Sequence, residues 1–568
     1  MWIKRIVWMV VGCCIICTSQ AADKQASYNK VVPLPREILL SEGRGFMIDG
    51  NCSIAFPDNM IDMQRNAGFL KDYVEKATGI SMALKPYIAN KTKKAARIKG
   101  DGHTLWLTIN AEITNDEGYR LTVNDRLVRI EGRTAQGVFY GIQTLRKSLP
   151  IILETERNDN SGVTNQVELP AVVINDQPRF AYRGMHLDVS RHFFGIDVVK
   201  EYLDIMALHN MNTFHWHITD DQGWRIEIKK YPKLAQLGSQ RKHTVIGRNM
   251  GVYDDTPYGG YFTQDEAREV VQYAKDRYIT VIPEVDMPGH MLGALKAYPE
   301  LGCTGGPYET EGRWGVFEDI LCAGNEQTYQ FINDVLDELM DIFPSQIFHI
   351  GGDEAPRERW EKCPKCQQRI RELGLKGDGK YAAEAKLQGY FTNRVENYLI
   401  SKGRRIIGWD EILEGDVNAS AMIMSWRGVK GGLEAAEKGH DVVMAPTSHG
   451  YFDYYQTNPE DWNNPTLFKA YLPMERVYSL DPSPDSLSVV AKKHIIGAQA
   501  NIWTEYIAYK NLLEYQMLPR AAAMCEVQWV MPKQKNYGDF LERERQMLNI
   551  YQLYNYTYCP AEFNKRKQ

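Results

Sequence analysis

The chain has 568 residues, which corresponds to two to four domains at about 100–200 residues per domain. Hydrophobic residues make up 44% of the chain and charged residues 24%, which excludes a disordered protein. The 67 Lys and Arg and the 72 Asp and Glu give a net charge of −5. Because no long basic run is present either, the charge argues against nucleic acid or an anionic membrane as the main partner.

The first 21 residues have the pattern of a secretory signal peptide. Lys4 and Arg5 precede an apolar run over residues 6–17, and a triplet with small residues at both ends closes at Ala21. The run is too short to cross a bilayer as a stable helix. We therefore expect cleavage after Ala21 and export to the periplasm or the medium, with no membrane span. The alternative is a lipoprotein signal, in which Cys13 carries a lipid anchor.

Residues 28–178 are predicted to form a small α+β domain. Three segments alternate apolar and polar residues like half-buried strands, and two segments have apolar residues at helical spacing. The predicted strands are 105–109, 119–123 and 127–130, and the predicted helices are 64–77 and 135–149. The polar segment that ends at Pro178 is the expected domain boundary.

Residues 179–535 alternate short apolar runs with longer helical stretches. Eight such runs are present: 184–189, 213–218, 280–285, 347–351, 405–409, 421–426, 441–444 and 496–503. This number and rhythm predict an α/β fold, a (β/α)8 TIM barrel that forms the catalytic domain. A doubly wound open sheet would usually begin with a Gly-rich phosphate loop, and the sequence has none. Residues 536–568 are predicted to be a helical extension packed on the barrel.

Five cysteines fall within the predicted barrel region, and four of them, at positions 303, 322, 363 and 366, are close enough in sequence to pair locally. In an oxidising compartment Cys303 with Cys322, and Cys363 with Cys366, are plausible local disulfides. The Cys363–Cys366 pair could instead be redox-active or half of a zinc site, but no second CxxC or HxxxH motif completes four ligands. We expect a structural staple for a loop, with no metal.

Catalytic residue types cluster where the predicted strands end, as expected for a TIM barrel. The clusters are Asp188 with Arg191 and His192; His215 and His217 with Asp220 and Asp221; Glu284, Asp286 and His290; His349, Asp353 and Glu354; Trp409, Asp410 and Glu411; Trp426; and Trp503 with Glu505. Three functions could use them. His215 and His217 could bind a metal or donate to carboxylates, carboxyl groups could hydrolyse a glycoside, or the pocket could bind a sugar without catalysis.

The adjacent acids Asp353 and Glu354 favour glycoside hydrolysis. Two like charges at a buried strand end cannot both ionise freely, so the pKa of one carboxyl rises and it stays protonated near neutral pH. Such a group is a general acid. Gly351 and Gly352 leave space in front of the pair.

Four segments resemble the β-N-acetylhexosaminidases of glycoside hydrolase family 20. They are 182–192, 215–225, 288–290 and 349–354. The resemblance extends from about residue 30 to residue 530, and it includes the small α+β domain that precedes the barrel in that family.

The resemblance implies substrate-assisted catalysis with retention of configuration. The acetamido oxygen of the substrate attacks the anomeric carbon and forms an oxazolinium intermediate. By position, Glu354 is the general acid/base, Asp353 stabilises the acetamido nitrogen, and Tyr451 orients the acetamido oxygen.

The resemblance also assigns the remaining site residues. Trp409, Trp426 and Trp503 would enclose the acetamido methyl group and the sugar face. Arg183, Asp453 and Glu505 would bind sugar hydroxyls and close one end of the pocket. Asp220 and His290, and more weakly His217 and His349, would support the acid pair.

The family resemblance predicts an exo-acting enzyme that removes terminal GlcNAc or GalNAc from oligosaccharides without a cofactor. Lacto-N-biosidase-like or chitobiase-like specificity, or sugar binding alone, are the alternatives. The sequence leaves open the natural glycan and its linkage, the GlcNAc against GalNAc preference, and the oligomeric state.

Overall fold

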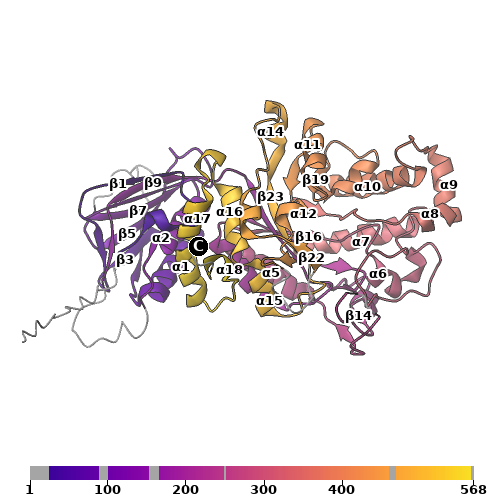
Figure 1. Cartoon of the computed structure of the whole chain (residues 1–568), viewed down its shortest axis with the longest axis horizontal. Helices are drawn as coiled ribbons and strands as arrows, with labels where there is room; N and C mark the ends of the chain where they lie inside the picture. Colours follow the sequence, from indigo (N-terminus) through magenta and orange to yellow (C-terminus); the bar gives the residue numbers. More distant parts are fainter. Residues whose placement is uncertain (1–24, 89–99, 153–165, 249–250, 459–467, 565–568) are drawn as a thin grey trace, which may run out of the picture.

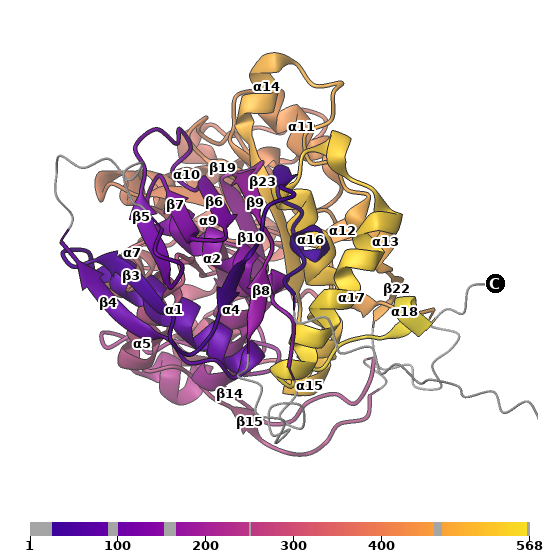
Figure 2. The ribbon, with the colours of Figure 1, turned by 90° about the vertical axis from the view of Figure 1, so that its left-hand side faces the viewer.

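The structure is a computed structural model, and it describes residues 25–88, 100–152, 166–248, 251–458 and 468–564. The predicted signal peptide, with Cys13, lies outside the described residues. The chain forms an N-terminal domain and a barrel that lie side by side (Figures 1 and 2). Within the described residues, no helix is long and apolar enough to span a membrane.

The N-terminal domain is a seven-stranded sheet covered on one face by two helices (Figure 2). Its strands, in spatial order, are β1 (Glu37–Leu40), β9 (Val172–Asp176), β6 (Tyr119–Asn124), β7 (Leu127–Gly132), β5 (Thr104–Ile109), β3 (Ser53–Pro57) and β4 (Ala83–Tyr87). The helices are α1 (Ile61–Thr78) and α2 (Ala135–Ser148), and β2 (Phe46–Ile48) pairs with β8 (Val167–Leu169). Each helix has a terminal signal in the sequence. Gly79 ends α1 in the left-handed conformation, and the Thr134 side chain accepts from the backbone of Gly137 at the start of α2.

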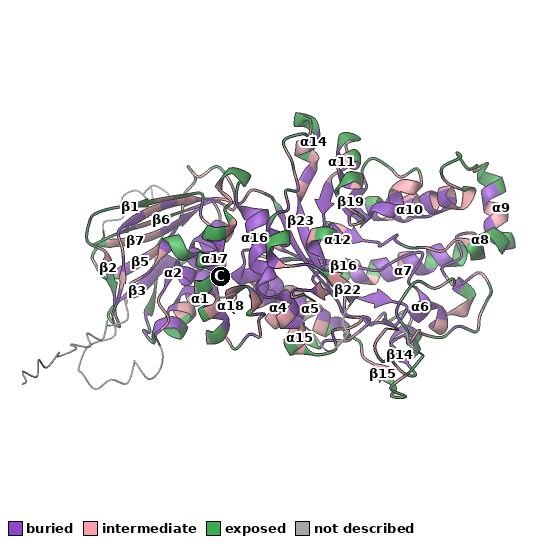
Figure 3. Cartoon of the chain, viewed as in Figure 1, coloured by how far each residue is buried: buried purple, intermediate pink, exposed green. Residues whose placement is uncertain are grey.

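The eight predicted apolar runs form the eight parallel strands of a closed barrel. In order these are β10 (Tyr182–Asp188), β11 (Thr213–His217), β16 (Thr280–Glu284), β17 (Ile347–His349), β18 (Arg405–Trp409), β19 (Met422–Ser425), β20 (Val442–Met444) and β23 (Ile495–Ile502). Most of these residues are buried, because side chains fill the barrel on the inside and helices cover it on the outside (Figure 3). The TIM barrel prediction is confirmed.

Most of the barrel helices have one side buried and the other exposed (Figure 3), but the helix over Arg520–Trp529 is buried along its whole length. The longer helices are α4 (Ile196–Leu208), α5 (Gln264–Asp276), α7 (Glu326–Ile342), α9 (Pro364–Leu373), α10 (Ala383–Ser401), α11 (Val429–Glu437), α15 (Lys510–Met517) and α16 (Arg520–Trp529). Shorter ones are α6 (Leu292–Ala297), α8 (Glu358–Lys362), α12 (Thr447–Gly450), α13 (Met474–Tyr478) and α14 (Val489–His494). A capping box of Thr263 and Glu266 starts α5.

Helix α17 (Tyr537–Leu553), near the C-terminus, lies between the two domains (Figure 1). It packs on α2 and on the short helix η1 (Tyr28–Lys30) of the N-terminal domain. On the barrel side, Arg543 pairs with buried Glu526 of α16 at 2.7 Å. The extension that we predicted to pack on the barrel therefore packs on the N-terminal domain as well.

Arg183 lies at the domain interface and not in a sugar site. It is the second residue of β10, at the amino end of the barrel, whereas catalytic groups of TIM barrels lie at the carboxyl end. Its guanidinium donates to both carboxylate oxygens of Glu117 in the N-terminal domain, at 2.8 and 2.9 Å, and to the Tyr140 hydroxyl at 2.8 Å. The prediction that Arg183 binds sugar hydroxyls is wrong, because these contacts bury its charge between the domains.

Glu117→Ala should lower the free energy of unfolding by about 3 kcal/mol, because it leaves the buried Arg183 guanidinium without a carboxylate. Urea denaturation of the full chain measures this loss. Glu42→Ala, which removes an exposed carboxylate from the same domain, is the matched control and should be neutral. Equal stability of the two variants would contradict a structural role for this ion pair.

Candidate active site

A pocket of about 360 Å³ opens at the carboxyl end of the barrel. It is lined by an acid pair, an indole wall, and further polar and loop residues. These are Asp353 and Glu354; Trp409, Trp426 and Trp503; and Arg191, His290, Trp314, Gly315, Val316, Thr447, Tyr451, Asp453, Tyr454, Glu505 and Tyr506.

The acid pair follows β17 on a tightly constrained turn. Glu354 has a φ of +43°, which a residue with a side chain adopts only under strain, and strained residues concentrate at functional sites. Gly351 and Gly352 precede it with φ of +62° and +100°. A Cβ on Gly351 would lie 1.7 Å from a carboxylate oxygen of Asp286, so only glycine fits there. The glycines therefore make room for Asp286 and aim Glu354 into the pocket.

The environment of the pair suits a general acid. Burial, and then the neighbouring Asp353 carboxylate, raise the pKa of Glu354. Its side chain is still 44% exposed, so it can reach a ligand, whereas that of Asp353 is only 12% exposed. Burial also raises the pKa of Asp353, and the His290 imidazole opposes this increase. Glu354 is thus favoured in the protonated form while it remains accessible.

His290 connects the acid pair to buried carboxylates behind the pocket. Its Nε2 lies 3.9 Å from a carboxylate oxygen of both Asp353 and Glu354. Its Nδ1 lies 3.2 Å from Asp220 and 3.1 Å from Asp221. Burial alone would lower the pKa of His290, but these two carboxylates raise it well above the ordinary value. The imidazole is therefore cationic, and it places positive charge next to the acid pair.

The two histidines of the His215–His217 strand end both contact one buried carboxylate. His215 Nε2 lies 3.0 Å from Glu284, and His217 Nδ1 makes a short contact with the same group. The other ring nitrogens lie 3.0 Å from Gln499 and 2.8 Å from Asp220. Both nitrogens of His217 thus have carboxylate partners and His215 Nδ1 faces the Gln499 amide, whereas His215 Nε2 approaches Glu284 without hydrogen-bond geometry. Three of the four nitrogens are therefore engaged by protein groups, which favours support of carboxylates over metal binding.

Glu284 is also bound by His349, whose Nδ1 lies 2.9 Å away, and by the Trp409 indole, which donates at 2.9 Å. Burial would raise the pKa of Glu284, but the surrounding imidazoles lower it well below its usual range. The predicted supporting residues Asp220, His217, His290 and His349 thus belong to one buried network. The sequence analysis gave Glu284 no role, although it ends a predicted strand.

Asp286 is a further buried acid that the sequence analysis assigned no role. It accepts a hydrogen bond from the backbone of Gly352 at 3.1 Å. Burial, and then the Asp353 charge, raise the pKa of Asp286 well above its ordinary value. Asp286 therefore stays neutral beside Asp353, and the pocket avoids two adjacent buried charges.

Indoles and tyrosines form the apolar wall. The rings of Trp409 and Trp503 have centroids 5.9 Å apart, and those of Trp426 and Tyr451 stack at 6.1 Å. The Trp426 indole is fixed by a 2.8 Å hydrogen bond to Glu411, as Trp409 is by Glu284. Because the indoles of Trp409 and Trp426 are fixed by hydrogen bonds, the rings form a rigid surface for a flat apolar group or a sugar face.

The polar end of the pocket contains Arg191, Asp453 and Glu505. Arg191 pairs with Asp220 at 2.8 Å and lies 5.0 Å from the Trp503 ring. One carboxylate oxygen of Asp453 is buried and has no hydrogen-bond partner within the described residues. Buried polar atoms normally have partners, so a ligand hydroxyl would satisfy this one.

The pocket brings together most of the residues that the sequence analysis assigned to it. Arg191 takes the place that we had given to Arg183; it follows the first predicted strand end, so position alone could have indicated it. Trp314 was missed without any signal, because it comes from a long loop between residues 302 and 319.

Comparisons with known proteins give one consistent family. The model "Glycosyl hydrolase family 20, catalytic domain" matches residues 180–532, and "Glycosyl hydrolase family 20, domain 2" matches residues 28–177. A beta-hexosaminidase of Porphyromonas gingivalis is 39% identical over 95% of this chain and 66% of its own length. One from Akkermansia muciniphila is 32% identical over 75% of this chain and 82% of its own length.

A solved structure has the same fold. The GH20 beta-N-acetylhexosaminidase of Streptomyces coelicolor superposes with a TM-score of 0.77 at 27% identity, over 95% of this chain and 98% of that one. This chain spans about two thirds of the length of some curated relatives, 66% for those of P. gingivalis and Vibrio furnissii. The family models, by contrast, account for both of its domains. The chain therefore belongs to glycosyl hydrolase family 20.

Proposed function

We propose that the protein is an exo-acting, retaining β-N-acetylhexosaminidase that removes terminal GlcNAc or GalNAc from glycans. The observation that carries the proposal is the acid pair. Glu354 is accessible with a raised pKa, and Asp353 is buried beside it against an indole wall. The named relatives, among them beta-hexosaminidases, support the same activity.

The size of the pocket supports release of a single sugar. At about 360 Å³ it is near the lower end of the range of about 300–1,000 Å³ for small-molecule sites. Arg191, Asp453 and Glu505 supply hydroxyl partners at its polar end. A lacto-N-biosidase-like enzyme, which releases a disaccharide, would need room for a second ring. The chitobiase-like alternative differs in the leaving group, and a panel of defined oligosaccharides distinguishes it.

The proposed reaction begins when Glu354 gives its proton to the leaving oxygen as the glycosidic bond breaks. The acetamido oxygen of the substrate forms the new bond to the anomeric carbon, and the resulting oxazolinium carries positive charge shared with nitrogen. The Asp353 carboxylate would stabilise that nitrogen, and the Tyr451 hydroxyl would orient the acetamido oxygen. Water then opens the ring and returns a proton to Glu354. Retention of configuration follows from the two displacements.

We also propose that the protein is exported. The support is the charged start, the apolar run and the small-residue triplet that ends at Ala21. Mass spectrometry of the mature N-terminus should find residue 22 first. A lipid-modified Cys13 at the N-terminus, or an intact leader on the mature protein, would contradict cleavage after Ala21.

Glu354→Gln should reduce kcat/KM by about 10²- to 10⁴-fold on oligosaccharides, and far less on aryl glycosides with activated leaving groups. Only the poor leaving group needs a proton from the enzyme. Steady-state kinetics on both substrate types measure the difference. Glu358→Gln, which changes an exposed acid four residues further along the chain, is the control and should leave both rates unchanged.

The pH profile gives a second readout of the same variant. A general acid must be protonated, so kcat/KM on oligosaccharides should fall as pH rises through a pKa above the ordinary value for Glu. That basic limb should disappear in Glu354→Gln. Equal losses on both substrate types, or a limb that survives the substitution, would contradict the assignment of Glu354.

Fluorination of the substrate's acetyl group should slow the reaction progressively from acetyl to trifluoroacetyl. Fluorine withdraws electrons from the attacking oxygen but adds little bulk, so the indole wall should still accept it. Each tenfold loss corresponds to about 1.4 kcal/mol of activation free energy, and we expect several such steps. Initial rates on aryl glycosides give the series. A flat series, or a glycosyl ester trapped on Asp353, would contradict substrate assistance; binding without any turnover would favour the non-catalytic alternative.

A further inference from the structure

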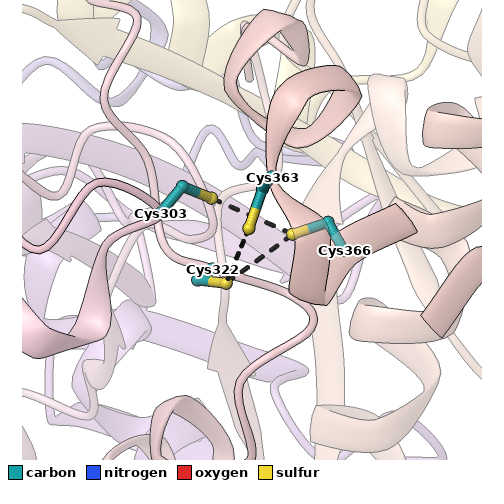
Figure 4. A group of neighbouring side chains, drawn as sticks. All are labelled: Cys303, Cys322, Cys363 and Cys366. Carbon is teal, nitrogen blue, oxygen red and sulfur yellow. Dashed lines mark hydrogen bonds between the residues drawn. The ribbon is translucent and has the colours of Figure 1, made fainter. Parts of the chain in front are cut away.

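Four cysteines from three separate segments converge at one point beside the barrel (Figure 4). The Sγ of Cys322 lies 3.7 Å from that of Cys363 and 3.6 Å from that of Cys366, and the Sγ of Cys303 lies 3.9 Å from that of Cys366. All four sulfurs lie within 4.8 Å of one another. Cys303 is half-buried and the other three are buried. The sulfurs therefore enclose one small, shielded volume.

The separations match a tetrahedral metal site. Zinc binds cysteine thiolates at about 2.3 Å, so sulfurs at the corners of a regular tetrahedron lie about 3.8 Å apart. Three of the Sγ–Sγ separations are 3.6, 3.7 and 3.9 Å, and the others are no longer than 4.8 Å. A disulfide joins two sulfurs at about 2.05 Å, and each cysteine in the described part of the chain is unbridged. The four sulfurs thus have the spacing of a tetrathiolate site rather than of two disulfide pairs.

The backbone holds the four ligands in place independently of any metal. Gly302 and Leu321 form an isolated antiparallel bridge, which brings the adjacent Cys303 and Cys322 together. The indole of buried Trp360 donates to the Leu321 carbonyl at 2.9 Å and joins α8 to that bridge. The site is therefore built into the fold.

The other two ligands form a CxxC pair at the start of α9. Cys363 is the N-cap of that helix and Cys366 is its third residue. The amino end of a helix is the positive end of its dipole and stabilises negative charge, which favours the thiolates that a metal requires. Because both sulfurs point at Cys322, this pair supplies one side of the tetrahedron (Figure 4).

We propose that Cys303, Cys322, Cys363 and Cys366 bind one Zn²⁺ ion as a structural tetrathiolate site. Each thiol loses its proton on binding, and four soft thiolates in tetrahedral geometry select zinc over harder cations. A disulfide staple was the expectation from the sequence, because the chain has no second CxxC motif to complete four ligands. In the structure the remaining two ligands come singly, from positions 303 and 322.

The site would fix a loop of the active-site pocket. Trp314, Gly315 and Val316 line the pocket and belong to the segment between Cys303 and Cys322. The segment from Glu354 to Cys363 begins at the proposed general acid. One zinc ion would therefore anchor both loops. They form part of the pocket rim where the leaving group of the substrate would lie.

Metal analysis of the purified full-length chain tests the proposal. We expect about one zinc per chain, with loss of zinc in Cys303→Ser and in the double variant Cys363→Ser/Cys366→Ser. Cys52→Ser, which changes a buried cysteine of the N-terminal domain, is the matched control and should retain the zinc. Replacing zinc by Co²⁺ should produce thiolate-to-cobalt charge-transfer absorption in the wild type, so the test does not depend on a variant that folds poorly.

The intact mass of the chain under denaturing conditions distinguishes the zinc site from two disulfides. Four cysteines released from zinc have the mass of four thiols, whereas two disulfides make the chain lighter by four hydrogens. Limited proteolysis between residues 302 and 322 should become faster once a chelator has removed the ion. A zinc-free chain, whether oxidised or reduced, or one that contains iron in place of zinc, would overturn the proposal. None of these outcomes bears on whether the protein hydrolyses hexosaminides.

Discussion

One buried carboxylate organises the active site. Glu284 receives contacts from three imidazoles and one indole, contributed by His215, His217, His349 and Trp409. These side chains come from three strands of the barrel, so their contacts with Glu284 fix them relative to one another. From Glu284 the network continues through His217 and Asp220 to cationic His290, which lies beside the acid pair. Within this network His217 lies between the carboxylates of Glu284 and Asp220, so opposite charges offset the cost of burying these ionisable groups.

The same network accounts for the different states of neighbouring acids. Asp286 is kept neutral by burial and by the Asp353 charge, whereas His290 moderates the pKa of Asp353. Glu354 stands on the exposed side of the pair, on a strained turn that aims it at the substrate. The protein therefore separates the roles of two adjacent carboxyl groups by burial and by charge. The indoles of Trp409 and Trp426 are held by carboxylates of the same region, so the acid pair and the apolar wall depend on the same buried groups.

The sequence predicted the barrel and most of the site residues, and each prediction that was wrong or missing has a physical cause. Buried parallel strands are short and continuously apolar, so the eight barrel strands could be located, and strand ends then indicated the acid pair and the indoles. Arg183 was assigned wrongly because the family resemblance was followed although residue 183 precedes the predicted run 184–189, at the amino end of the strand; its Glu117 partner lies 66 residues away in the chain. The cysteine cluster was missed for a similar reason, since Cys303 and Cys322 approach the CxxC pair only in three dimensions. Trp314 reaches the pocket from a loop, whose conformation carries no periodic signal.

The central claim is that the substrate supplies the nucleophile while Asp353 and Glu354 act on nitrogen and on the leaving oxygen. A crystal structure with a stable cyclic analogue, in which sulfur replaces the attacking oxygen, tests this most directly. The account predicts that the ring nitrogen lies within hydrogen-bond distance of Asp353, with the methyl group enclosed by Trp409, Trp426 and Trp503. Glu354 should approach the face of the anomeric carbon from which the leaving group departs. An analogue bound with Asp353 against the anomeric carbon, and its nitrogen turned toward solvent, would contradict the account.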